Sequence, residues 1–107
     1  MTNLSEQEFR IRSDEALDTA RKALLSLADV EGFEIELQNG VLELVFEDPV
    51  TAKFVVSPNA PMRQIWVAAM AKSYKVPWDP DSKRFALNGE LLPVLLDRLA
   101  RAFLQSA

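Results

Sequence analysis

Apolar residues recur at helical spacing in two segments, one near each end of the chain. In the first segment Ser5 and Glu8 form a capping box, which predicts a helix from Ser5 to about Leu27. In the last segment the same spacing predicts a helix over residues 90–105, where Pro93 is tolerated because it falls in the first turn. The side chains expected to be buried are Phe9, Ala16, Leu17, Ala20, Leu24 and Leu27 in the first helix and Leu92, Leu95, Leu96, Leu99 and Phe103 in the second.

Between these helices the pattern changes to the apolar and polar alternation that is typical of strands with one wet face. Asn39-Gly40 is the strongest of the turn signals, because this dipeptide favours a two-residue hairpin. Short polar loops favour antiparallel pairing, and two amphipathic helices need a sheet face on which to bury their apolar stripes. The segments predict about six strands, over residues 33–38, 41–46, 52–56, 63–68, 74–76 (ended by Pro77) and 83–87. The expected fold class is α+β, a two-layer sandwich with the N- and C-terminal helices on one face of an antiparallel sheet and the other face open.

Segment 57–68 begins as a proline-containing turn and ends as a strand. Strand side chains alternate between faces, so Ile65 and Val67 share one face and Gln64 and Trp66 share the other. If the branched residues face the core, a tryptophan stands beside a glutamine on the open face, where aromatic side chains are typical binding anchors. The alternative is an ordinary strand with Trp66 buried.

Composition limits the chemistry. A chain of 107 residues fits one domain, here residues 1–107. Cysteine and histidine are both absent, which removes thiol nucleophiles, catalytic triads and the usual zinc ligands, so we expect no enzyme and no catalytic residues. The net charge of −4 argues against nucleic-acid binding, and no apolar run approaches the ~20 residues that span a bilayer. The N-terminal residues resemble neither a secretory signal nor a transit peptide, so we expect a cytoplasmic protein.

Charge is distributed unevenly along the chain. Residues 1–48 hold 12 acidic and 4 basic side chains, whereas residues 49–107 hold 4 acidic and 8 basic ones. Any metal site must be built from oxygen, and exposed carboxylates suit hard cations such as iron, manganese, calcium or magnesium, which they hold weakly. A docking surface for a basic partner, or a solvated surface without a ligand, would use the same residues. The candidate metal ligands are Asp14, Asp18, Asp29, Glu31, Glu34 and Glu36.

Three motifs in the same order resemble the frataxin family. The run from Pro61 through Gln64-Ile65-Trp66 resembles the family signature, whose glutamine and tryptophan lie on the exposed sheet face. Asn39-Gly40-Val41-Leu42 is similar to the turn after the family's first strand, and Asn88-Gly89-Glu90-Leu91 to the turn that opens its last helix. The predicted element order also matches, so the resemblance covers nearly the whole chain.

The resemblance implies a function as well as a fold. It implies weak binding of Fe²⁺ or Fe³⁺ along an acidic ridge, and an accessory or regulatory role in iron–sulfur cluster assembly. It also implies a monomer that docks to a cysteine desulfurase and a scaffold protein through Asn59, Gln64 and Trp66. The chain departs from the family at Ser57, where asparagine is usual, and at Phe85, where tryptophan is common. It also departs where a glycine-rich stretch is replaced by Ala71-Lys72-Ser73, and at Arg21, Lys22 and Leu25, where acidic residues are common.

Two other functions use the same composition. A small acidic binding chaperone, such as a secretion chaperone, would have no metal role and would dimerise through an apolar groove. A carboxylate metalloenzyme such as a ferroxidase would need four or more converging buried carboxylates, whereas the alternation here directs the acids outward. Trp78 and Tyr74 either extend the open face or, for Trp78, pack over a sheet edge.

Overall fold

The computed structural model describes residues 4–106, which fold into two helices and a seven-stranded antiparallel sheet. The strands follow one another across the sheet in chain order, so each pairs with its neighbours in the sequence. In chain order the elements are α1 (Glu6–Glu31), β1 (Glu34–Gln38), β2 (Val41–Phe46), β3 (Ala52–Asn59), β4 (Gln64–Ala69), β5 (Lys72–Asp79), β6 (Arg84–Leu87), β7 (Glu90–Leu91) and α2 (Leu92–Leu104).

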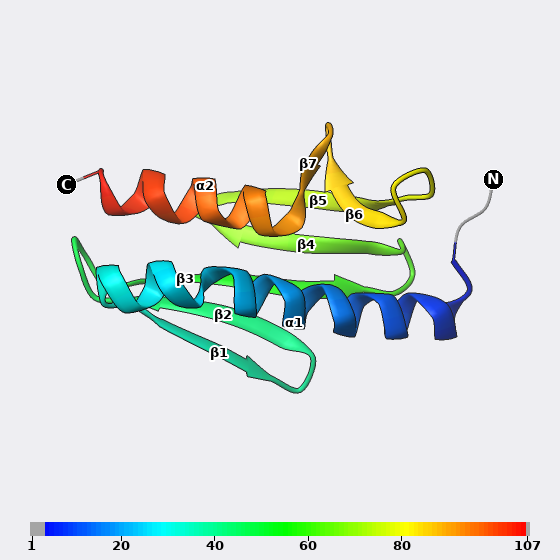
Figure 1. The fold of residues 1–107 in the computed structure, drawn as a ribbon, viewed down its shortest axis with the longest axis horizontal. Coiled ribbons are helices and arrows are strands. Elements are labelled where there is room, and N and C mark those ends of the chain that lie inside the picture. Colours follow the sequence, from blue (N-terminus) through cyan, green and yellow to red (C-terminus); the bar gives the residue numbers. More distant parts are fainter. Residues whose placement is uncertain (1–3, 107) are drawn as a thin grey trace.

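Both helices lie on the same face of the sheet, side by side and running in the same direction (Figure 1). Within residues 4–106 the other face carries no helix, so the predicted two-layer α+β sandwich with one open sheet face is confirmed. The sheet has one strand more than expected, because residues 90–91 form the short strand β7 before α2 begins. Neither helix in residues 4–106 is both long enough and apolar enough to cross a membrane.

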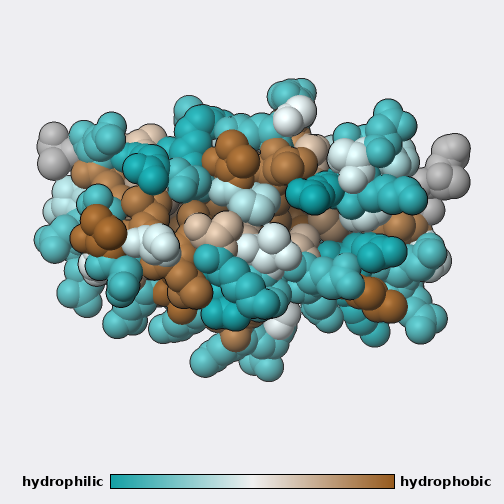
Figure 2. Space-filling model, in the orientation of Figure 1, coloured by the Kyte–Doolittle hydropathy of each residue, from teal (hydrophilic) through white to brown (hydrophobic). Residues whose placement is uncertain are grey.

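The core lies between the helices and the inner face of the sheet. Phe46 on β2 is at its centre, with ring centroids 4.9 Å from Phe54 and 4.7 Å from Phe103 of α2. Every side chain of the two predicted stripes is buried except Ala16, which is half-buried. On the helix side the outer surface is largely hydrophilic, with apolar patches between the two helices (Figure 2).

Helix α1 begins as predicted but ends later. The Ser5 hydroxyl accepts from the Glu8 amide, and the Glu8 carboxylate accepts from the Ser5 amide, each at 3.1 Å. The helix continues four residues past Leu27, because Ala28 extends the buried stripe and Gly32 supplies the stop. Gly32 has a φ of 83°, and its amide donates to the Ala28 carbonyl, which is the usual glycine end of a helix.

Two strands run through prolines that the sequence pattern treats as breaks. Strand β3 includes Pro58, and β5 includes Pro77, so the predicted end of the fifth strand at Val76 is wrong. Proline lacks an amide proton and is tolerated where a strand has only one neighbour. That is the case here, because β2 pairs with β3 only as far as Val56, and β6 pairs with β5 only at residues 78–79.

The turn before α2 also differs from the prediction. Asn88 and Gly89 both have positive φ values, 52° and 83°, and close a two-residue hairpin between β6 and β7. The expected helix start at Glu90 is therefore wrong, because Glu90 pairs with Leu87 in the sheet. The helix starts at Leu92, and Pro93 falls in its first turn as expected.

Candidate functional site

Strand β4 has the predicted orientation. Ile65 and Val67 are 0% and 1% exposed beneath the helices, whereas Gln64 and Trp66 are half-buried on the opposite, open face. The alternative, with Trp66 in the core, is wrong. The alternation of a single strand therefore places an indole on the face of the sheet that no helix covers.

Neighbouring groups on the open face hold the Trp66 side chain. Its indole N–H donates to Oε1 of Gln64 at 2.9 Å, and Nζ of Lys75 lies 5.2 Å from its ring centroid. Lys75 is directly opposite Trp66 on β5, and Ser57 is directly opposite on β3. A lysine over an indole face is a cation–π contact, which adds attraction and restricts the ring. We refer to Ser57, Asn59, Gln64, Trp66 and Lys75 as the Trp66 patch.

Asn59 is next to Gln64 across the β3–β4 pair and has a structural contact of its own. Its Oδ1 accepts from the Met62 amide at 3.0 Å and so shapes the turn that leads into β4. Arg63 ends that turn with a φ of 54°, and its guanidinium donates to the Leu4 carbonyl at 2.9 Å. The turn beside the Trp66 patch is thus braced by side chains and attached to the segment before α1.

Trp78 and Tyr74 do not belong to the Trp66 patch. They share the inner face of β5 with the buried Val76. The Trp78 ring packs edge-on against Phe85, with centroids 5.1 Å apart. Of the two alternatives for Trp78, the packing position is therefore correct.

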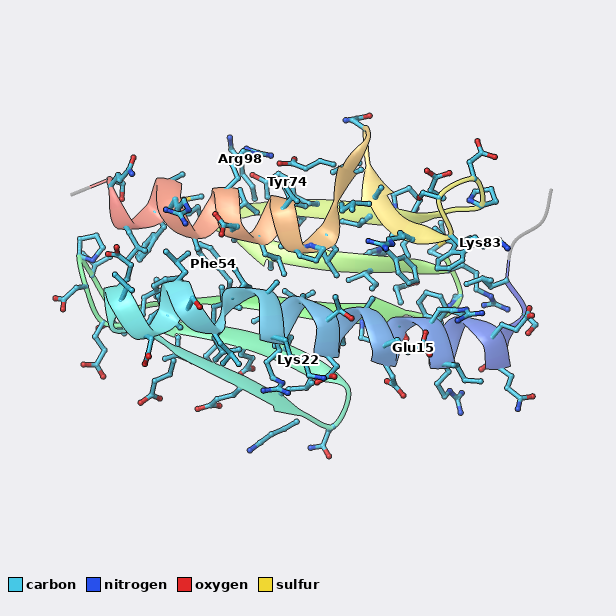
Figure 3. The ribbon with its side chains drawn as sticks, viewed as in Figure 1. Glu15, Lys22, Phe54, Tyr74, Lys83 and Arg98 are labelled. Atoms are coloured by element: carbon cyan, nitrogen blue, oxygen red, sulfur yellow. The ribbon has the colours of Figure 1, made fainter. Side chains whose placement is uncertain are left out.

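Two of the predicted metal ligands, Asp14 and Asp18, are one turn apart on α1, and Asp18 is already paired. Asp18 accepts from Arg21 at 3.0 Å and forms an ion pair with Lys22 at 3.1 Å. Figure 3 shows Lys22 on the side of α1 that faces away from α2. The Arg21 hydrogen bond, helped by Lys22, lowers the pKa of the Asp18 carboxyl. A metal ion at Asp18 would therefore have to compete with two cations, whereas Asp14 is exposed and has no ion pair within residues 4–106.

The other four predicted ligands are exposed around the junction of α1 and β1. Asp29 and Glu31 lie in the last turns of α1, and Glu34 and Glu36 lie on the outward face of β1. We refer to these four with Asp14 and Asp18 as the acidic ridge. Within residues 4–106 no three carboxylates are close enough together to hold one metal ion. The donor set suits a hard cation that keeps most of its own water, rather than an enclosed metal centre.

The structure adds one carboxylate and one lysine that the sequence analysis did not include. Glu43 on β2 is directly opposite Glu36 across the first hairpin, and its carboxylate is 3.7 Å from Lys53. The two-residue Asn39-Gly40 loop fixes this register, so alternation and loop length together could have identified Glu43. Lys75 was harder to find, because the register of β4 and β5 depends on a two-residue loop that contains neither glycine nor asparagine.

Comparisons with known proteins agree with the motifs and the fold. Residues 2–105 match the family model described as a frataxin-like domain. The chain is 38% identical over 76 residues to "Iron-sulfur cluster assembly protein CyaY" of Cupriavidus metallidurans, covering 69% of this chain and 67% of that protein. It is 31% identical over 101 residues to the protein of the same name from Pseudomonas putida strain GB-1, covering 91% and 86%.

A solved structure gives the same result for the fold. The frataxin from Psychromonas ingrahamii superposes with a TM-score of 0.62 over 96% of this chain and 92% of that one, at 18% sequence identity. The order of elements, the open sheet face with its glutamine and tryptophan, and the family match over residues 2–105 agree with one another. This chain belongs to the family of frataxin-like proteins.

Proposed function

We propose that this protein is an accessory or regulatory factor of iron–sulfur cluster assembly that acts by docking. Its relatives from Cupriavidus metallidurans and Pseudomonas putida are named iron–sulfur cluster assembly proteins. The partners are a cysteine desulfurase and an iron–sulfur scaffold protein, and the docking surfaces are the Trp66 patch and the acidic ridge. The protein contributes binding and positioning rather than covalent chemistry.

The Trp66 patch is the observation that carries this proposal. An indole of large area stands on an open sheet face and is held by Gln64 and Lys75. Because its ring is already restricted, little side-chain entropy is lost when a partner packs against it. Amide and hydroxyl groups from Asn59 and Ser57 lie in the same rows of the sheet and can add directional hydrogen bonds.

The acidic ridge gives the second contact. Its six carboxylates lie on the helix and edge strand that form one side of the molecule, where they can attract a basic surface of the partner. Iron is bound there weakly as Fe²⁺ or Fe³⁺ and is cargo rather than a resident cofactor. The negative charge of the acidic ridge therefore attracts both the iron cation and the basic surface of the assembly complex, and so brings the two together.

A pull-down experiment tests the docking role. Trp66→Ala should weaken capture of a purified desulfurase–scaffold pair by about tenfold or more, since a central tryptophan typically contributes ~2 kcal/mol or more to an interface. The matched control is Met62→Ala, which removes another exposed apolar side chain from the neighbouring turn. Equal loss in both variants, or none in either, would reject the Trp66 patch as the docking surface.

Titration calorimetry with Fe²⁺ tests the acidic ridge. The double variant Glu34→Lys/Glu36→Lys should abolish the binding heat, because it replaces two ligands by cations. Asp81→Lys/Asp97→Lys is a control that makes the same charge change in the turn before β6 and on α2. Unchanged iron affinity in the ridge variant would refute the site, and gel filtration of the same samples would show whether the protein is the proposed monomer.

A further inference from the structure

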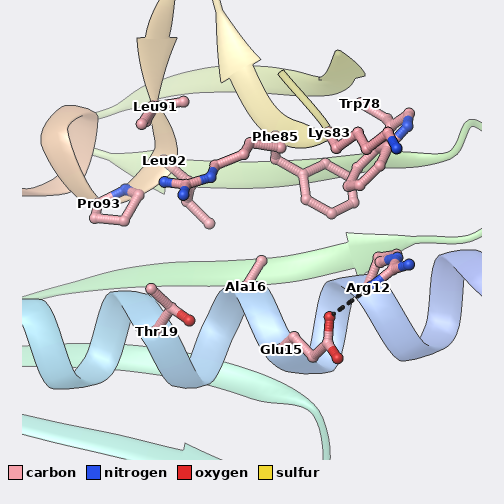
Figure 4. A pocket seen from close by; sticks show the side chains of 11 residues that line it. Arg12, Glu15, Ala16, Thr19, Trp78, Lys83, Phe85, Leu91, Leu92 and Pro93 are labelled. Atoms are coloured by element: carbon pink, nitrogen blue, oxygen red, sulfur yellow. Dashed lines mark hydrogen bonds and ion pairs between the residues drawn. The ribbon is translucent and has the colours of Figure 1, made fainter. Parts of the chain in front are cut away.

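A half-open pocket of about 260 Å³ lies between the N-terminal half of α1 and the segment from β5 to the start of α2, and none of the residues of the Trp66 patch or the acidic ridge lines it. Figure 4 shows Ala16 and Thr19 of α1 on one side of it and Trp78, Phe85 and Leu92 on the other. The floor is apolar, since Phe85 and Leu92 are buried and Trp78 is half-buried. The pocket can thus accept an apolar group.

The rim of this pocket is cationic, although the protein as a whole is acidic. Three basic side chains line it, against the single carboxylate of Glu15. They are Arg12 of α1, Lys83 of the turn before β6, and Arg84, the first residue of β6. Glu15 is already paired with Arg12 at 3.2 Å. Within residues 4–106 no carboxylate forms an ion pair with Lys83 or Arg84.

Asp81 is the nearest acidic residue in the sequence and does not line the pocket, and Asp79 is occupied by hydrogen bonds within its own turn. Asp79 accepts from the Ser82 hydroxyl and the Asp81 amide, both at 3.0 Å, and it does not line the pocket. The uncompensated positive charge therefore stays at the rim. A ligand that places negative charge at the rim and an apolar group on the floor complements both features.

The small size of the pocket favours a single side chain over a whole cofactor or drug-sized molecule. Pockets for cofactors and drug-sized molecules usually measure ~300–1,000 Å³ and enclose most of the ligand. This one is smaller and open to solvent, so it suits a single side chain with its flanking residues outside. A peptide segment meets that condition, because neighbouring acidic residues can reach the basic rim while one apolar side chain enters the pocket.

We propose that this pocket binds an acidic peptide segment of a partner protein, with one leucine-sized side chain on the Trp78–Phe85 floor and carboxylates against Arg12, Lys83 and Arg84. This contact is separate from the Trp66 patch and from the acidic ridge. The protein would then have two binding sites of opposite charge. The acidic ridge would bind basic partner surfaces, and the pocket near the start of α2 would bind an acidic segment.

Tryptophan fluorescence can test the proposal directly. The chain has two tryptophans, so Trp66→Phe leaves Trp78 as the sole reporter on the pocket floor. The probe is a blocked peptide of sequence DDELEDD, titrated into this protein at low salt. We expect a saturable change in Trp78 emission. We also expect Lys83→Ala/Arg84→Ala to weaken binding by about fivefold, which corresponds to two exposed charge pairs near the middle of their usual range of ~0.2–1 kcal/mol each.

The control variant Lys53→Ala/Lys72→Ala removes two exposed lysines near the starts of β3 and β5, neither of which lines the pocket. It should bind within about twofold of the parent, because surface charges beyond ~10 Å are screened. Equal weakening by both double variants would show unspecific charge attraction and overturn the proposal. Equal binding of a peptide with serine in place of leucine, or no Trp78 response at millimolar peptide, would also overturn it. Circular dichroism confirms folding of each variant, and the outcome is independent of the desulfurase–scaffold pull-down.

Discussion

Neighbouring residues on β4 should respond very differently to the same truncation, because they lie on opposite faces of the sheet. Ile65→Ala removes three carbon atoms from a side chain that is 0% exposed. At ~0.8 kcal/mol per buried methylene this removes roughly 2.4 kcal/mol, and the cavity raises the cost to about 3–4 kcal/mol. Trp66→Ala deletes a larger side chain from a half-buried position. It loses cross-strand contacts of ~0.2–1 kcal/mol and a cation–π contact of ~0.5–1 kcal/mol, while the Gln64 amide released from the indole can bond to water instead. We therefore expect a cost of about 1–2 kcal/mol at Trp66.

Urea denaturation followed by far-ultraviolet circular dichroism measures both free energies of unfolding. Ile65→Ala should lose at least about twice as much free energy of unfolding as Trp66→Ala. Side-chain size alone would predict the opposite order. If Ile65→Ala does not fold, Ile65→Val provides the comparison per carbon removed. A loss of 3 kcal/mol or more at Trp66 would mean that the indole is part of the core, and the reasoning from the open face would fail.

Three further outcomes concern the helices. Ser5→Ala should cost about 1 kcal/mol in the free energy of unfolding, because it removes the hydroxyl that caps α1 at Glu8, and Ser5→Asp should restore most of it. Gly32→Ala should cost about 1–2 kcal/mol in the same assay despite open space around the new methyl group, because the φ of 83° disfavours any side chain. Arg98 donates to both Glu90 oxygens at 2.9 Å and lowers the pKa of the Glu90 carboxyl. The stability that this ion pair contributes is therefore fully present above the ordinary carboxyl pKa. It is lost as the pH falls through the lowered pKa of Glu90. The stability difference between the wild type and Arg98→Met should accordingly be visible at pH 7 and vanish in acid, and a difference that persists in acid would contradict the ion pair as its cause.

The layers of the fold could be predicted from local patterns. Helical spacing around Leu17 and Leu96 and strict alternation around Ile65 each specify which face of an element is buried, and burial decides how the layers stack. The Trp66 orientation follows from the same rule, because its two branched neighbours must share the opposite face. These conclusions need only the sequence within a few residues.

Other features depend on which strands are neighbours in the sheet. Pro58 and Pro77 look like breaks in the sequence, yet each lies in a stretch of strand with a single partner, where proline is tolerated because one side of the strand has no ladder to interrupt. The pairing of Lys75 with Trp66 likewise depends on the register of β4 and β5. The strand propensity of one segment does not reveal how far the neighbouring strand extends, and that extent decides which residues are paired.

The candidate metal site shows a third limit. Composition leaves carboxylates as the available ligands, but the number that can meet at one ion depends on three-dimensional spacing. In the structure Asp18 is bound by Arg21 and Lys22, whereas Glu36 is opposite Glu43. The sequence could predict that the acidic ridge is negatively charged. Which of its carboxylates form ion pairs and which stay exposed could be learned only from the structure.

The sheet has two edge strands, β1 and β7. Strand β7 has only two residues and leads directly into α2, so β1 is the longer exposed edge. An outer strand offers unsatisfied backbone groups to any other chain that arrives in extended form. Glu34 and Glu36 stand on that strand and repel a second copy that would align there. The carboxylates therefore also protect against aggregation, and exchanging both for glutamine would be expected to promote fibril-like association in concentrated solution without altering the fold of the single molecule.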